Sequence, residues 1–167
     1  MMCDLARAKN MFFEHACDHQ YMLRNGTWDA YKAFHISSDQ EYQWKCEYLD
    51  DKVQLASAST GSQRVWAIVR GIDIAVQLDK IEIVYKIVDE YAQSAAEDDL
   101  LHLLIISEHL ISRIENGILP FGIISKLYSI LELSSSALNT DADEKLSKRL
   151  QEALFRIERL SRGQSAR

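Results

Sequence analysis

The chain has 167 residues, 47% of them hydrophobic and 26% charged, and its formal net charge is −6. These values fit one domain with an ordinary packed core and exclude the low-hydrophobicity, high-charge compositions of disordered chains. A pI near 5.4 argues against nucleic-acid binding, and the longest stretch without Asp, Glu, Lys or Arg, residues 53–63, is too short and too polar to span a membrane.

Glycine and proline are scarce, since the chain has six glycines and a single proline. This scarcity favours long helices over a turn-rich β fold. The first predicted helix covers residues 4–25 and ends at Gly26, after which Thr27 begins a short helix. Ser38 and Glu41 have the spacing of a capping box and predict the start of the next helix. Its apolar stripe is expected at Tyr42, Cys46, Leu49, Val53 and Ala56.

The sequence pattern in the middle of the chain is compatible with either a strand or a helix. Residues 72, 74, 76 and 78 are apolar and alternate as in a strand, whereas Val65, Ile68 and Ile72 with Val76 also form a helical stripe. We favour the helix because the turn residues of a hairpin are missing. Asp79 is then predicted to cap the helix that follows.

The second half of the chain predicts three further helices. An apolar helix opens after the acidic triplet at 97–99 and closes at Gly117, and the next begins after Pro120. The last is capped by Thr140 and ends at residues 162–163. We therefore predict an all-α fold of about seven helices in antiparallel hairpins, as a compact bundle or a short helical stack. We expect residues 1–162 to form its single domain and residues 163–167 a flexible tail. No sequence consensus recurs at about 34 or 40 residues, the repeat lengths of helical solenoids.

Charge is distributed unevenly in the second half. Residues 97–144 hold nine acids against two bases, a balance of −7, and residues 145–167 hold seven bases against two acids, a balance of +5. One interpretation is that these charges favour the ends of helices. The other is an acidic surface that meets a basic partner.

The chain contains none of the phosphate-loop, dinucleotide, nucleophile-elbow or zinc-protease motifs. His15 and His19 lie one helical turn apart, but no further metal ligand is required by spacing. Cys17 lies between them at i±2, which points it away from both. We expect no catalytic residue, no metal and no cofactor. His102 and His109 are expected to be hydrogen-bonded residues at the core boundary.

The odd count of three cysteines without a C-x-x-C pair argues against a secreted disulfide framework, and no export signal is visible. We therefore expect a cytoplasmic protein.

The block H-x-x-M-x-R-x-G at residues 19–26, followed by Y-x-x-x-x-I-S at 31–37, is either a packed elbow between helices or a binding surface. The block resembles the N-terminal segment of small helical bacterial proteins, some of which are encoded beside toxin genes. The resemblance covers residues 12–44 and implies a toxin-immunity or similar partner-blocking role, without catalytic residues.

The sequence thus predicts an acidic protein-binding domain that covers the active or basic surface of a protein partner, with no nucleic acid and no membrane as partners. The alternative is a non-catalytic helical scaffold or regulator. The oligomeric state stays open. The predicted partner-binding residues are Arg24, Trp28, Tyr31, Glu47, Asp50, Asp51, Glu97, Asp98 and Asp99.

Overall fold

The computed structural model describes residues 37–95, 99–136 and 144–165. These residues form helices and contain no strand, which confirms the all-α prediction and the choice of helix for residues 72–78. The helices are α4 (Ser38–Ala58), α5 (Gly61–Gln77), α6 (Ile81–Ser94), α7 (Leu100–Glu115), the 3-10 helix η2 (Phe121–Ile123), α8 (Ile124–Ser136) and α9 (Glu144–Ser165). The two helices predicted within residues 4–35 and the predicted cap Thr140 lie outside the described residues.

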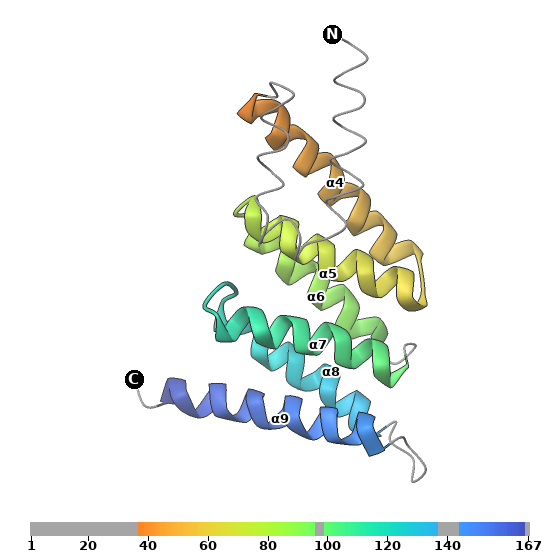
Figure 1. The fold of residues 1–167 in the computed structure, drawn as a ribbon, viewed down its shortest axis with the longest axis vertical. Helices are drawn as coiled ribbons and strands as arrows, with labels where there is room; N and C mark the ends of the chain where they lie inside the picture. Colours follow the sequence, from red (N-terminus) through yellow and green to blue (C-terminus); the bar gives the residue numbers. More distant parts are fainter. Residues whose placement is uncertain (1–36, 96–98, 137–143, 166–167) are drawn as a thin grey trace.

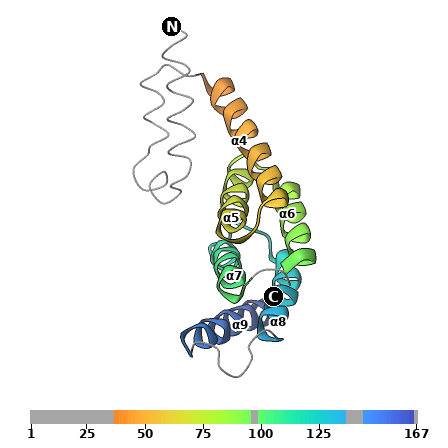
Figure 2. The ribbon, with the colours of Figure 1, turned by 90° about the vertical axis from the view of Figure 1, so that its right-hand side faces the viewer.

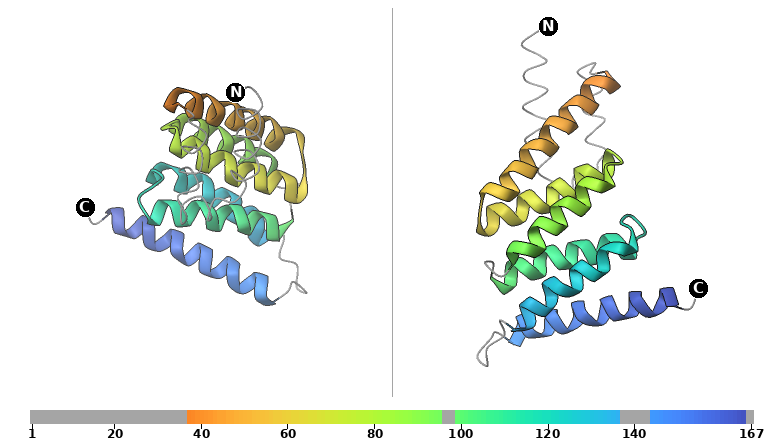
Figure 3. Two further views of the ribbon diagram at one scale, coloured as in Figure 1. Left: turned by 45° about the horizontal axis from the view of Figure 1, so that its top comes forward. Right: turned by 180° about the vertical axis from the view of Figure 1, so that it is seen from behind.

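The helices are stacked in two layers. Figure 1 shows α5, α7 and α9 facing the viewer, and Figure 2 shows these three on one side with α4, α6 and α8 on the other. Seen from behind, the second layer is in front (Figure 3, right). The pairs α4–α5, α5–α6, α7–α8 and α8–α9 pack as antiparallel hairpins, and the pairs α4–α6, α5–α7, α6–α8 and α7–α9 join each helix to the next but one. The fold is therefore a short helical stack, one of the two forms that the sequence predicts.

Within the first layer the helices run parallel, because later residues of one helix meet later residues of the next. Ser62 in α5 contacts His102 in α7, 40 residues on. Glu108 and Glu115 in α7 contact Arg149 and Arg156 in α9, each 41 residues on. Corresponding positions thus recur after 40 or 41 residues in space, although no sequence consensus recurs at that distance.

The core follows the interface between the two layers. In α7 the buried apolar residues include Leu103, Leu104, Leu110 and Ile111, and α9 buries Leu150 and Ile157 and partly covers Leu146, Leu154 and Leu160. In α4 the prediction was wrong at Tyr42, which is 52% exposed, and it missed the buried Trp44 and Tyr48. Residues with fully covered side chains include Leu49, Ile72, Val84, Leu104, Leu110, Leu127 and Leu131. No helix in the described ranges is both long enough and apolar enough to cross a membrane.

Two helix ends differ from the prediction by one position. The N-cap of α4 is Ser37, whose Oγ accepts a hydrogen bond from the Gln40 N–H, rather than Ser38. Asp79 does not cap α6. It follows the end of α5 with a φ of 56°, while Lys80 N–H donates to the Ala75 carbonyl, the bond of a Schellman motif.

The last helix is longer than predicted. It continues past residues 162–163 to Ser165. Gly163 lies inside it, with open space where a Cβ would stand. The predicted end failed because a glycine two residues before a helix end resembles the glycine that stops one.

Candidate functional site

An acidic surface lies along α4. Asp39, Asp50 and Asp51 are exposed and Glu47 is partly exposed; we call these four residues the acidic face. Positions 39, 47, 50 and 51 fall within about 120° of one helical face at 100° per residue. The two lysines of α4 are on the opposite side, and their side chains are only 16% (Lys45) and 13% (Lys52) exposed.

Lys52 pairs with one member of the acidic face, Asp51, whereas Lys45 pairs with Glu41, which lies outside that face. Lys45 Nζ lies 2.9 Å from Glu41 Oε1, and Lys52 Nζ lies 2.7 Å from Asp51 Oδ2 and 4.7 Å from the centre of the Tyr48 ring. Their alkyl stems pack along the helix while their charged ends reach carboxylates. The three predicted partner-binding acids in this part of the chain, Glu47, Asp50 and Asp51, therefore lie together with Asp39 on one negative surface.

The one described residue of the second predicted acidic segment, Asp99, has a capping role in the structure. Asp99 is the N-cap of α7, and its Oδ1 accepts a hydrogen bond of 2.9 Å from the His102 N–H. This is the capping role that favours a helix start. Glu97 and Asp98 lie outside the described residues, as do Arg24, Trp28 and Tyr31. No contact described here joins Asp99 to the acidic face.

The charge switch between the two C-terminal segments is explained by ion pairs between helices. Arg149 donates from Nε and Nη2 to both carboxylate oxygens of Glu108, at 2.9 and 2.6 Å. Arg156 binds Glu115 in the same way, at 3.1 and 2.5 Å, and Arg159 adds a third bond at 3.0 Å. These bonds hold the pKa of Glu115 below its usual value, chiefly through the Arg156 hydrogen bond. Part of the acidic stretch thus pairs with α9 and is not offered to a partner.

A buried carboxylate joins α5 to α7. Asp73 is 5% exposed, and its Oδ1 lies 3.0 Å from His109 Nε2 and 3.0 Å from Arg113 Nη2. His102, one heptad earlier, contacts Ser62 Oγ at 3.3 Å and Asp99 Oδ2 at 3.2 Å. Both histidines are therefore hydrogen-bonded boundary residues, as predicted. Among the described residues, no three His, Cys, Asp or Glu side chains gather closely enough to hold a metal ion.

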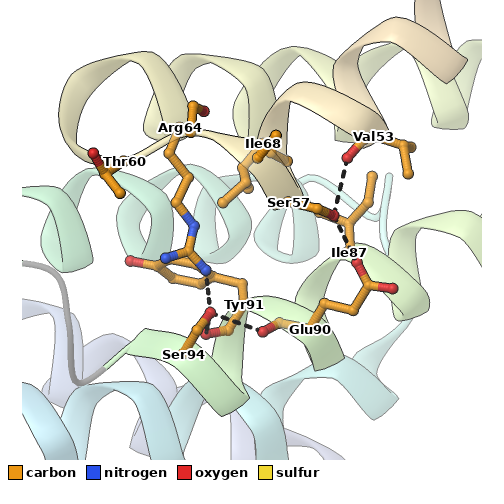
Figure 4. A pocket seen from close by; sticks show the side chains of 12 residues that line it. Val53, Ser57, Thr60, Arg64, Ile68, Ile87, Glu90, Tyr91 and Ser94 are labelled. Carbon is orange, nitrogen blue, oxygen red and sulfur yellow. Dashed lines mark hydrogen bonds between the residues drawn. The ribbon is translucent and has the colours of Figure 1, made fainter.

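A cavity of about 380 Å³ opens where the α4–α5 turn meets α6. Its apolar wall is formed by Val53, Ile68 and Ile87. Its polar wall contains Arg64 from α5 and Glu90, Tyr91 and Ser94 from α6, and the turn contributes Ser57, Ala58, Ser59 and Thr60 (Figure 4). The volume lies within the range of small-molecule sites.

Arg64 is the most unusual side chain of this cavity, because it is only 8% exposed. Its guanidinium stacks on the Tyr91 ring at 5.2 Å and donates from Nη2 to Ser94 Oγ. Ser94 in turn donates to the Glu90 carbonyl at 3.0 Å. Two neighbours on α6 thus hold the guanidinium in one orientation, as Figure 4 shows.

Sequence reasoning missed this cavity. Arg64 stands one helical turn before Ile68 and two turns before Ile72, on the edge of the stripe predicted to be buried. A charged residue on an apolar stripe is a signal for a buried polar site. Glu90, Tyr91 and Ser94 carried no such signal, since their approach to Arg64 depends on how α6 packs against α5.

The chain was compared with protein-family models, with curated proteins and with solved structures, and none of the three comparisons gave a match. Its own residues are therefore the basis for a functional assignment.

Proposed function

We propose that the chain is a non-catalytic protein-binding module and that it meets a basic partner surface through the acidic face of α4. The observation that carries this proposal is the excess of exposed acids on one face of α4. Asp39, Asp50 and Asp51 are exposed, whereas Lys45 and Lys52 are largely covered and Lys52 pairs with Asp51. A surface of one charge sign steers an oppositely charged partner and suppresses wrong ones.

The N-terminal resemblance implies that the chain acts as an immunity protein, which binds a toxin and covers its active or basic surface. The two-layer stack supports a second candidate function, a helical scaffold or regulator, because stacked helices offer extended surfaces without chemistry of their own. The two differ in what binding does to the partner. An immunity protein abolishes the partner's activity, whereas a scaffold leaves that activity in place.

Affinity capture with matched charge variants tests the proposal. The full chain is used as bait beside Asp50→Lys/Asp51→Lys and beside a control, Glu132→Lys/Glu152→Lys, which changes net charge equally at exposed positions on α8 and α9. We expect the parent and the control to retain one partner that the α4 variant loses. Equal recovery by all three would refute the acidic face as the binding surface. The captured partner's activity, with and without the chain, then separates immunity from scaffolding.

A further inference from the structure

We propose that the cavity between the α4–α5 turn and α6 binds a small zwitterion of the free amino-acid type, with an apolar side chain. The ligand's carboxylate binds Arg64, its ammonium binds Glu90, and its side chain packs on Val53, Ile68 and Ile87. This site is separate from the acidic face and does not depend on it.

Arg64 provides the carboxylate site. A guanidinium has five N–H donors in one plane and binds a carboxylate in a bidentate manner. Burial strengthens such a bond, because fewer waters compete for it. The Tyr91 ring and Ser94 orient Arg64 before any ligand arrives, so little conformational freedom is lost on binding.

Glu90 provides the site for the ammonium. Its side chain is 48% exposed and lines the same cavity, and its Oε2 lies 3.4 Å from Ser57 Oγ. Lys86 Nζ is 3.8 Å from Glu90 Oε1, on the same helix and itself 63% exposed. An exposed i,i+4 pair of this length is weak, so a ligand ammonium can replace it.

The remaining surface selects an apolar side chain of moderate size. Val53, Ile68 and Ile87 come from three different helices and form one wall. Because the cavity contains both a carboxylate-binding arginine and an ammonium-binding glutamate, it selects against ligands with one charge. A simple anion is repelled by Glu90, and a simple amine is repelled by Arg64. The combination fits a zwitterion with a hydrocarbon body.

Calorimetric titration of the full chain with L-leucine, L-methionine and L-phenylalanine tests this, each beside two analogues that lack one charged group. For L-leucine, which carries both groups, 4-methylpentanoate lacks the ammonium and 3-methylbutylamine lacks the carboxylate. We expect L-leucine, L-methionine or L-phenylalanine to bind at millimolar concentration or below, and the best of the three to bind more tightly than its analogue without the ammonium. The amine is expected not to bind. Failure of all three amino acids to bind, or equal binding of the acid that lacks the ammonium, would overturn the proposal.

Variants locate the binding in this cavity. Arg64→Gln should weaken binding by about 30-fold or more, the loss typical of truncating one side of a hydrogen-bonded charge pair. Arg70→Gln is the matched control, since Arg70 also stacks on an aromatic ring, Trp66 at 5.5 Å, but lies outside the cavity. Glu90→Gln should equalise the affinities for the amino acid and its deaminated analogue.

A second variant covers the case in which Arg64→Gln fails to fold. Ala58 is exposed at the mouth of the cavity, so Ala58→Trp can obstruct entry while leaving the core unchanged. If Arg64→Gln folds and binds the amino acid as tightly as the parent, the assignment of the site to this cavity is contradicted. If Arg64→Gln does not fold, undiminished binding by Ala58→Trp contradicts it instead.

Discussion

Single residues fix where the helices end, and Gly117 is the clearest case. Its φ is +68°, its N–H donates to the Ile114 carbonyl, and the Ile118 N–H donates to the Arg113 carbonyl. These are the two bonds of a Schellman motif, which needs a residue in the left-handed region. The sequence predicted this end correctly because only glycine enters that region without strain.

Alanine at two glycines should therefore have opposite effects. Gly117→Ala should lower the free energy of unfolding by about 1 kcal/mol, because a side chain is strained in the left-handed region. Gly163→Ala, inside α9 with open space around it, should cause no loss or a gain of up to about 1 kcal/mol, since alanine favours helix. Urea denaturation of both variants measures the difference. A loss at Gly163 as large as that at Gly117 would contradict the described ends.

Other helix ends could not be predicted to the residue. Ser37 with Gln40 and Ser38 with Glu41 both have capping-box spacing, and only the packing of α4 selects Ser37. Asp79 is a good N-cap residue, yet it lies in the left-handed region, which aspartate tolerates better than most residues. In both cases the local signal was real and its exact position depended on the tertiary structure.

At the scale of elements, apolar periodicity predicted the helices well where they are covered on several sides. The apolar helix predicted between residues 99 and 117 is α7, which packs on α5, α8 and α9 and buries most of its apolar residues. At α4 the stripe was misplaced toward Tyr42, because the covered stems of Lys45 and Lys52 occupy half-buried positions that periodicity counts as polar.

The α7–α9 ion pairs predict a dependence of stability on pH. The pKa of Glu115 is lowered in the folded state, so its contribution is present above the unfolded pKa and is lost as pH falls through the folded one. The difference in unfolding free energy between the parent and Glu115→Gln should thus shrink from about pH 6 to about pH 3. Chemical denaturation across that range measures it. Glu132→Gln, at an exposed position on α8, is the control, and a pH-independent difference for Glu115→Gln would disprove the role of the pair.

At the scale of the whole molecule, the stacking of the helices decides which charges are available. From the sequence, residues 97–99 and 47–51 were equivalent acidic candidates. The structure uses Asp99 as a cap and pairs Glu108 and Glu115 with α9, which leaves the acidic face of α4 exposed. Each of these ion pairs joins residues that are 41 positions apart in the sequence. Apolar periodicity within one helix does not predict which residues of two such distant helices come into contact.

The cavity likewise arises only in the stack. Its lining comes from α4, α5 and α6, and the hydrogen bonds between these helices join residues that are 30 and 33 positions apart in the sequence. Apolar periodicity predicted that Val53 and Ile68 of the hydrophobic wall belong to buried stripes, but the approach of Glu90 to Ser57 depends on the angle between helices. The fold class was therefore accessible from the sequence, and the site was not.

The most direct test of the acidic face is the rate of association with the captured partner as a function of salt. Asp50→Lys/Asp51→Lys should slow association by about 10-fold or more at low salt, because exposed charges steer encounter. The difference should shrink at high salt, since charges are screened over ~8 Å already at physiological ionic strength. Circular dichroism and melting temperature of the same variant should match the parent. Unchanged association at low salt would contradict the central claim.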